Sequence, residues 1–452
     1  MSEPKTMSLT MKVMLGMIFG IITGLVINLS GLNATGGFIH TYIVDGAFYI
    51  IGKMFINALK MLVVPLVFFS LICGVCGIGN LNTLGRVGSK AFILYMLTTA
   101  TAIALAITIA AAVGIGEGMN LQTTAHFAGR DAPPLSDVLI NIIPTNPLKA
   151  MVNGEMLPII FYSILIGISM LMVGRKAKSF IEGAEVANEV MMKMVTIIMS
   201  VAPYAVFALI AKSMAELGLE LLHQLAGYVA VLIAALLVHL FVTLMIVLKV
   251  FSNLSPTLFL KKIRNAQVFA FSTASSNATI PVTLRTVTQR MGVDNSVASF
   301  TVPFGATINM DGTAIMQGVA TVFIANVYGV DLGITGYLTV ILMSVLASIG
   351  TAGVPGVGLI MLSMVFSQVG LPIEGIGLIL GVDRLMDMIR TAVNVSGDAV
   401  VSTVVAKSEG KIDLAIYNDI KAGAVSEDDN LHIDTVIEQD LATVIQQTHD
   451  KK

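Results

Sequence analysis

The chain has 452 residues, of which 56% are hydrophobic and 12% charged, with 41 glycines and no tryptophan. Its 26 basic and 28 acidic residues give a formal net charge of −2, so the charge gives no sign of nucleic-acid binding. Soluble domains rarely have this composition, and several apolar runs approach or exceed the roughly 20 residues that cross a bilayer as a helix. The sequence therefore predicts an all-α integral membrane protein.

The first apolar run, residues 11–30, predicts a retained helix. A signal peptide is the alternative, but the run is long and no clear small-residue cleavage pattern follows it. Hydropathy predicts further spanning segments at residues 40–77, 90–116, 155–174, 189–212 and 226–251.

Basic residues lie in alternate loops, which predicts the orientation of the chain. They occur before the first helix and in the second, fourth and sixth loops, at Lys5, Lys12, Arg86, Lys90, Arg175, Lys176, Lys178, Lys261, Lys262 and Arg264. Because basic loops stay in the cytoplasm, we expect these loops and both termini there.

Three other segments have simpler interpretations. Cys73 and Cys76 form a CxxC pair, but no second pair or nearby histidine supports a metal or redox site, so we interpret them as packing residues. Residues 117–154 contain four prolines and predict an irregular external excursion. The acidic segment of residues 412–452 predicts a polar cytoplasmic tail.

Beyond residue 255 the sequence contains two segments with the same pattern. Each has an apolar arm, a tip of small residues with a proline (residues 271–283 and 347–358), a second arm and then a long helix with polar residues at its centre. Paired interrupted segments indicate an inverted repeat with a binding site near the membrane midplane, and re-entrant hairpins fit this pattern. Two ordinary helices kinked at proline are the alternative.

The stretch VDRLMDMIRTAVNVSGD, residues 382–398, contains five charged residues among apolar neighbours. At 3.6 residues per turn, one helix face about 22 Å long collects Asp383, Asp387, Arg390, Asn394 and Asp398. Five unpaired charges at membrane depth would cost about 12 to 17 kcal/mol. They must therefore pair with one another, or face water, ions or a ligand in a cavity. A structural ion-pair network is the alternative.

A second polar cluster, Asn309 and Asp311, lies between Gly305 and Gly312, where local unwinding would free carbonyl groups. Oxygen ligands without thiolates or ligand nitrogens suit a hard cation, so Na⁺ or H⁺ is expected rather than zinc.

The remaining polar groups suit an anionic ligand. The hydroxyl-rich tip at Ser275, Ser276 and Asn277 offers donors to a carboxylate. Arg390 would bind a second carboxylate and Asp387 an ammonium group. Together these groups describe an acidic amino acid.

NMDGTA, ASIGTAGVPG and DMIRTAVNVSGD, with NIIPTNPLKAMVNGEMLPIIF in the external loop, resemble motifs of the dicarboxylate/amino acid:cation symporters. That family includes the excitatory amino-acid transporters and the archaeal aspartate transporters, and the likeness extends from the first helix to about Lys411. It implies eight transmembrane helices, two re-entrant hairpins and an elevator-type transporter in the bacterial inner membrane, assembled as a homotrimer among lipids.

The resemblance also implies a division of the chain. The scaffold would contain helices 1 and 2 (residues 11–78) and residues 150–251, which hold helices 4 and 5 and the helix 6 region. The moving part would contain helix 3 (residues 89–117) and a transport core (residues 255–411). The second hairpin would be the gate.

The resemblance further implies site residues. Substrate contacts would be Ser275, Ser276, Met310, Thr313, Val354, Gly358, Asp387, Arg390, Thr391 and Asn394. One Na⁺ would bind near Gly305, Asn309, Asn394 and Asp398, a second at backbone oxygens of Thr307, Ser348, Ile349 and Thr351, and a third at Tyr95, Thr98, Thr99, Asn309 and Asp311.

Three positions bear on the substrate and the coupling ion. Arg390 favours an acidic substrate, Asp387 favours an amino acid over a plain dicarboxylate, and Asp398 favours Na⁺, since proton-coupled relatives can carry an amide there. Ala274 departs from archaeal relatives, which have an arginine at the first hairpin tip. Arg384 lies about 100° around the helix from Asp383 and is not an obvious substitute.

The expected function is Na⁺-coupled uptake of glutamate or aspartate, with no cofactor and no enzymatic activity. The alternatives are cystine or a C4-dicarboxylate as substrate, H⁺ as coupling ion, a channel, and an intramembrane aspartyl enzyme built on Asp383 and Asp387. Two carboxylates at i, i+4 beside Arg390 would stay ionised rather than share a proton, which argues against the enzyme.

Overall fold

The computed structural model of the chain describes residues 9–33, 37–76, 84–118, 140, 142–349, 353 and 355–423. This part is helical, has no β-strand, and contains one isolated antiparallel bridge between Val293 and Ile412. The predicted all-α class is confirmed.

The α-helices are α1 Leu9–Leu29, α2 Tyr49–Cys76, α3 Ser89–Val113, α5 Pro147–Asn153, α6 Met156–Val173, α7 Lys178–Ser200, α8 Ala202–Leu217, α9 Leu219–Val238, α10 Leu244–Ser252, α11 Pro256–Thr273, α12 Ser276–Arg285, α13 Asn295–Ile308, α14 Asp311–Val327, α15 Gly333–Ser348, α16 Val357–Gln368, α17 Ile376–Ser408 and α18 Leu414–Asn418. The π-helical stretches are η1 Ile39–Phe48, η2 Leu84–Gly88, η4 His239–Thr243 and η5 Thr286–Arg290, and the 3₁₀ turns are η3 Gly174–Ala177 and η6 Ile373–Gly375.

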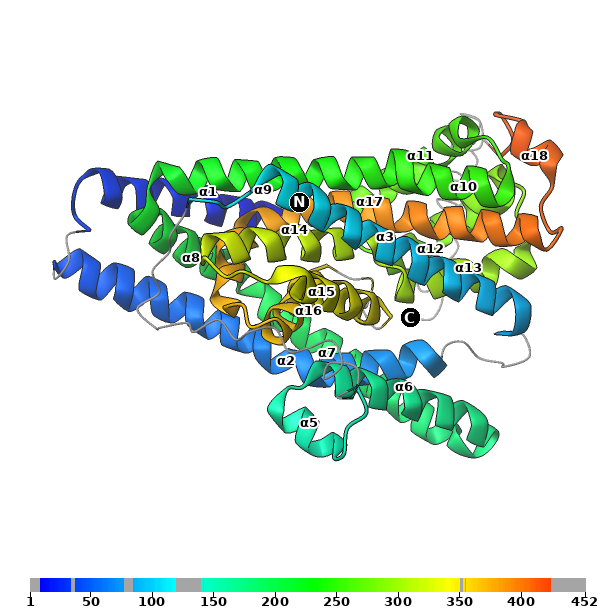
Figure 1. The fold of residues 1–452 in the computed structure, drawn as a ribbon, viewed down its shortest axis with the longest axis horizontal. Coiled ribbons are helices and arrows are strands. Elements are labelled where there is room, and N and C mark those ends of the chain that lie inside the picture. Colours follow the sequence, from blue (N-terminus) through cyan, green and yellow to red (C-terminus); the bar gives the residue numbers. More distant parts are fainter. Residues whose placement is uncertain are drawn as a thin grey trace, which may run out of the picture.

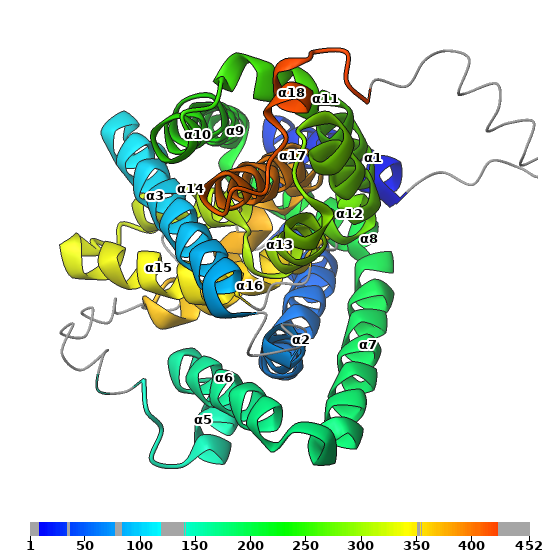
Figure 2. The ribbon, with the colours of Figure 1, turned by 90° about the vertical axis from the view of Figure 1, so that its right-hand side faces the viewer.

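Helices α14 and α17 form the centre of the molecule (Figures 1 and 2). Nearly every residue of α14 is buried, as is α17 from Val393 to Ala406. Around them pack α3, α9, α11, α13 and α16. Small residues permit the close approach: a Cβ at Gly318 of α14 would lie 3.2 Å from Ile103 and Ile107 of α3. The polar residues singled out in the sequence thus lie in the most buried part of the fold.

Two groups of outer helices pack differently. α6 and α7 pack on α2 and project from the central bundle, as Figure 2 shows. In contrast, α9, η4 and α10 pack on α3, α14 and α17. Residues 219–252 are therefore attached to the centre rather than to the projecting pair.

A glycine stripe joins α1 to α8. Gly16, Gly20 and Gly24 are spaced by four residues and face the α8 backbone, and a Cβ at Gly20 would lie 2.8 Å from the Phe207 carbonyl oxygen. This spacing is a recurrent device for close helix contact in membranes, where apolar burial drives little association.

By length and apolar composition, five helical stretches in the described part could cross a membrane: Met11–Leu29, Ile39–Cys76, Arg86–Val113, Pro158–Ser200 and His223–Ser252. The helix expected over residues 189–212 is instead divided between α7 and α8. Pro203, in the first turn of α8, has no N–H to continue the hydrogen bonding of α7, so a new helix begins there.

The predicted interruptions lie near the centre of the fold. α13 ends at Ile308 and α14 begins at Asp311, with extended backbone at Asn309 (φ −108°, ψ 91°). α11 and α12 pack against each other across a turn at Ala274, which has a left-handed φ of +49°. The second tip lies between α15 and α16 and is only partly within the described residues.

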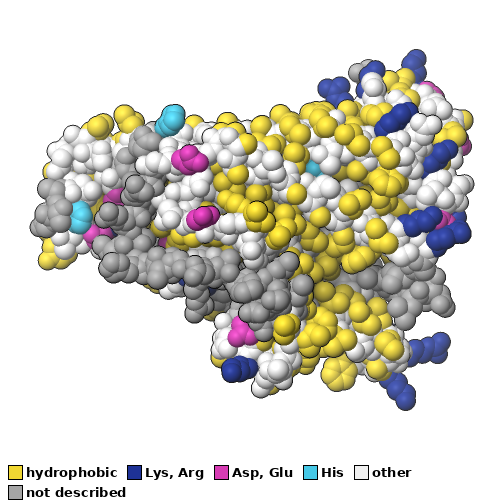
Figure 3. Space-filling model, in the orientation of Figure 1, with side chains coloured by type: hydrophobic (Ala, Val, Ile, Leu, Met, Phe, Trp, Pro, Cys, Tyr) yellow, Lys and Arg dark blue, Asp and Glu magenta, His cyan; other side chains and the backbone are white. Residues whose placement is uncertain are grey.

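Charged side chains are unevenly distributed on the visible face. Lys and Arg gather at the right-hand end in Figure 3, and hydrophobic side chains cover much of the middle. This pattern suits a bundle whose long axis crosses the membrane.

An ion-pair cluster connects α17 to the beginning of α3. Glu409 accepts hydrogen bonds from Lys90 Nζ at 2.6 Å and from Arg86 Nη2 at 2.5 Å. The Lys90 and Arg86 hydrogen bonds lower the pKa of the Glu409 carboxyl. A carboxyl with a lowered folded-state pKa adds stability above its ordinary pKa and loses it as the pH falls through the folded value.

We expect Glu409→Gln to lower the melting temperature of the detergent-purified protein at pH 7. The neutral amide cannot form the ion pairs that the Glu409 carboxylate forms with Arg86 and Lys90. The difference in melting temperature from wild type should begin to shrink below about pH 4.5, the ordinary pKa of the carboxyl, and should vanish once the pH is below the lowered pKa of the folded state. Thermal unfolding from pH 3 to 8 measures both effects, and a difference that is independent of pH would contradict the assignment.

Candidate substrate and cation site

Arg390 lies in the middle of α17 and its side chain is fully buried. Its Nη1 lies 2.6 Å from Asp383 Oδ1, and its Nη2 lies 2.8 Å from Asp387 Oδ1. These internal pairs offset much of the cost of burying three charges on one helix. The Nε–H has no hydrogen-bond partner in the described part of the chain, so one buried donor remains for a ligand.

Two predicted substrate residues, from α14 and α16, lie close to the Arg390 guanidinium. A Cβ at Gly358 of α16 would lie 3.4 Å from both Arg390 Nη2 and Thr313 Cγ2 of α14. The absence of a side chain at Gly358 thus lets α16 approach the guanidinium, and Thr313, Gly358 and Arg390 lie close together.

The tips of the two interrupted segments contact each other beside Thr313, Gly358 and Arg390. Ser275 Oγ donates to the Gly353 carbonyl at 2.7 Å, and the Asn277 amide donates to the same oxygen at 3.1 Å. Ser276 is buried next to them, and the Gly356 amide lies 3.4 Å from Asp387 Oδ2. The hydroxyl predicted for substrate therefore holds the tips together in this structure. Val354 lies outside the described residues.

Asn394 connects the arginine cluster to the break between α13 and α14. Its Oδ1 accepts the Gly312 amide at 2.7 Å, and its Nδ2 lies 3.4 Å from Met310 Sδ. One turn earlier, the Thr391 hydroxyl donates to the Asp387 carbonyl at 2.7 Å. The predicted substrate residues Met310, Thr391 and Asn394 therefore lie between the two polar clusters.

The second cluster contains two buried carboxylates, those of Asp311 and Asp398. Asn309 Nδ2 donates to Asp398 Oδ1 at 2.9 Å. Thr99 Oγ1 donates to Asp311 Oδ1 at 2.7 Å, and Thr98 Oγ1 lies 3.4 Å from the same oxygen and from Asn309 Oδ1.

Close backbone approach explains the glycines of this cluster. A Cβ at Gly305 would collide with Asp398 Oδ1 and would lie 2.6 Å from Tyr95 Oη. A Cβ at Gly397 would lie 2.7 Å from Asn309 Nδ2. The residues predicted for the first and third Na⁺ are thus brought together by α3, α13, α14 and α17.

The two clusters differ in charge compensation. Asp383 and Asp387 pair with Arg390, and Arg384 Nη1 lies 3.8 Å from Asp387 Oδ2. Within the described residues, neither Asp311 nor Asp398 forms an ion pair with a lysine or arginine. Two buried carboxylates with no lysine or arginine partner favour a bound cation, since no permanently charged side chain offsets their desolvation.

The second predicted Na⁺ site receives less support from the geometry. Thr307 lies near the end of α13, whereas Ser348 and Ile349 lie at the end of α15. The Ile349 carbonyl oxygen faces α2, since a Cβ at Gly74 would lie 3.2 Å from it. Thr351 lies outside the described residues, and this site stays a prediction.

One residue of the cation cluster was not predicted from the sequence. His239 of η4 is fully buried, and its Nε2 lies 3.0 Å from Asp311 Oδ2. Its signal was a lone histidine within the apolar run of residues 227–251, because ionisable residues inside membrane helices are rare and usually functional.

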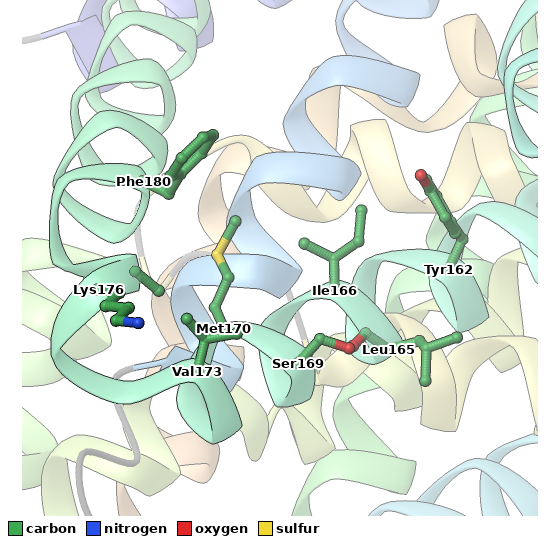
Figure 4. A pocket seen from close by; sticks show the side chains of 9 residues that line it. Tyr162, Leu165, Ile166, Ser169, Met170, Val173, Lys176 and Phe180 are labelled. Atoms are coloured by element: carbon green, nitrogen blue, oxygen red, sulfur yellow. The ribbon is translucent and has the colours of Figure 1, made fainter.

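The described cavity lies elsewhere. A groove of about 410 Å³ is formed by α6, η3 and α7, with Tyr162, Met170 and Phe180 among its apolar lining and Lys176 at one end (Figure 4). It includes none of the predicted site residues.

Comparisons with known proteins agree with these features. The model of the sodium:dicarboxylate symporter family matches residues 9–408. The proton/sodium-glutamate symport protein of Geobacillus stearothermophilus is 32% identical, covering 92% of this chain and 97% of the relative. The proton/glutamate-aspartate symporter of Escherichia coli is 34% identical (80% and 85%), and the C4-dicarboxylate transport protein of Bacillus subtilis is 32% identical (90% and 95%). The chain belongs to the sodium:dicarboxylate symporter family.

Proposed function

We propose that this protein is a secondary active symporter that couples Na⁺ influx to the uptake of glutamate or aspartate. One observation carries the proposal: a buried arginine with a free donor lies next to two buried carboxylates that have no lysine or arginine partner among the described residues. The first arrangement suits an anionic substrate, and the second suits a cation.

We assign each polar group of the substrate to a different part of the site. Arg390 binds the side-chain carboxylate, Asp387 binds the amine, and the tip at Ser275 and Ser276 binds the α-carboxylate. The Arg390 Nε–H supports this assignment, because a buried donor without a partner costs about 1 to 3 kcal/mol until it is met. Asp383 would hold the guanidinium in place.

Coupling between the two ligands follows from shared residues. Asn394 lies between Arg390 and Asp398 on α17 and accepts the Gly312 amide at the beginning of α14. A cation at Asp398 or Asp311 would fix the break between α13 and α14, and with it Asn394 and Met310. Sites that share an element in this way change each other's affinity reciprocally.

The names of the relatives support this substrate class and leave the coupling ion open. Two of those described name glutamate and one names a C4-dicarboxylate. Asp387 favours an amino acid, because its carboxylate would repel a plain dicarboxylate. Two relatives are named for protons, and H⁺ is the second candidate ion. The aspartate at 398 favours Na⁺, since it can supply a full negative charge.

We further propose the architecture of eight membrane-spanning helices and two re-entrant hairpins, working as an elevator in a trimer in the bacterial inner membrane. α11 with α12, and α15 with α16, would be the hairpins, and α2, α6 and α7 part of the scaffold. The sequence boundaries put residues 150–251 in the scaffold. Residues 219–252 fit better in the moving part, because they pack on α14 and α17 and include His239, which contacts Asp311.

Membership of a symporter family identifies the protein as a transporter rather than an enzyme. The geometry adds a reason against an aspartyl enzyme. Asp383 and Asp387 contact different nitrogens of Arg390, so each carboxylate is engaged by the guanidinium.

Arg390→Lys should raise the KM for glutamate and aspartate at least tenfold in proteoliposome uptake, because lysine cannot make a bidentate contact with a carboxylate. Arg384→Lys is the matched control and should change KM little. Arg390→Ala should lose the acidic substrate altogether. Na⁺-dependent glutamate uptake at the wild-type rate in Arg390→Ala would refute the site assignment.

Asp398→Asn should raise the Na⁺ concentration for half-maximal uptake about tenfold or more, since a neutral amide replaces a charged cation ligand. Asp387→Asn makes the same chemical change three turns earlier and should instead raise the KM for the amino acid. Na⁺ titrations at saturating substrate, and substrate titrations at saturating Na⁺, separate the two effects. Equal Na⁺ dependence in wild type and Asp398→Asn would exclude Asp398 as a ligand.

A further inference from the structure

We propose that His239 is a positioning residue that holds the Asp311 carboxylate for the cation. The inference rests on the proposed function, because it concerns the cation site of that symporter. It adds a residue that neither the sequence motifs nor the names of the relatives indicate.

The contact is buried and direct. His239 and Asp311 are both 0% exposed, and Nε2 lies 3.0 Å from Asp311 Oδ2. The other carboxylate oxygen, Oδ1, accepts the Thr99 hydroxyl at 2.7 Å. Asp311 is therefore held at both oxygens by two helices, α3 on one side and the α9–η4–α10 run on the other.

The helix around His239 is adapted to this contact. His239 begins the π-helical stretch η4, which interrupts the α-helical hydrogen bonding between α9 and α10. Such π-bulges are uncommon and often occur at functional sites. On the far side, a Cβ at Gly397 would lie 3.1 Å from Asp311 Oδ2, so the α17 backbone also bounds the carboxylate. Little room is left for the Asp311 side chain to move.

The chemistry of imidazole suits this position. A carboxylate oxygen only accepts, so the contact requires the proton on Nε2. Nδ1 has no hydrogen-bond partner in the described part of the chain, so the polar contact of the ring there is the one made by Nε2. His239 thus offers one N–H donor to Asp311. A lysine or arginine in its place would neutralise Asp311 and repel the cation that the carboxylate is to bind.

Residues that orient a metal ligand commonly change metal affinity tenfold or more when they are replaced. Three substitutions at His239 distinguish positioning from packing. Glutamine can place its amide N–H near the position of Nε2, whereas asparagine is too short and leucine has no donor. Positioning predicts that glutamine restores function and that asparagine does not. Packing predicts the same result for both amides.

The test is a Na⁺ titration of glutamate uptake in proteoliposomes, together with Na⁺-dependent thermal stabilisation of the purified protein without substrate. We expect His239→Leu and His239→Asn to raise the half-saturating Na⁺ concentration about tenfold. His239→Gln should stay within about twofold of wild type. The glutamate KM at saturating Na⁺ should change little in any of them. The amide pair keeps the test valid if the leucine variant does not fold.

The Na⁺ affinity of Asp398→Asn is measured in parallel. This comparison distinguishes a wrong role for His239 from a wrong proposed function. If Asp398→Asn loses Na⁺ affinity while His239→Asn matches wild type, the positioning role is overturned and the symporter stands. Equal Na⁺ affinities in His239→Gln and His239→Asn also overturn the role. If neither the glutamate uptake nor the thermal stability of the wild-type protein depends on Na⁺, both the proposed function and this inference are overturned.

Discussion

The organisation of the protein depends on the cost of burying carboxylates in a helical membrane bundle. Asp311, Asp383, Asp387 and Asp398 are all at least nine-tenths buried, and each would carry a desolvation penalty of several kcal/mol if unpaired. Two of them are compensated by Arg390. The other two have only neutral donors and a histidine. In the proposed function, this asymmetry divides one polar centre into a half that binds the anionic substrate and a half that binds the cation.

Glycines and helix breaks make that centre possible. The chain leaves helical geometry at Asn309 and Met310, so polar side chains and backbone groups can converge between α13 and α14. Gly305 and Gly397 let two helices approach the carboxylates, and Gly358 lets α16 approach Arg390. At membrane depth, such breaks are tolerated only where other protein groups, a ligand or a water-filled cavity satisfy the backbone. The breaks and the site are therefore one structural feature.

The position of Arg384 shows how helix phase and side-chain length combine. Its position lies about 100° around the helix from Asp383. Its side chain is nevertheless long enough to bring Nη1 to 3.8 Å from Asp387 Oδ2. The first tip has Ala274 in a left-handed conformation and contributes no charge there. Positive charge near the Asp387 carboxylate thus comes from Arg384 and Arg390 of α17 itself.

The sequence by itself determined the membrane class, the helix interruptions and the polar face of α17. These depend on hydropathy, on glycine and proline, and on a 3.6-residue period, which are local properties. Only the tertiary structure brought Ser275 to Gly353 and placed His239 against Asp311. These two contacts join residues 78 and 72 positions apart in the chain. Local patterns cannot specify them, because which helices face each other depends on packing of the whole bundle.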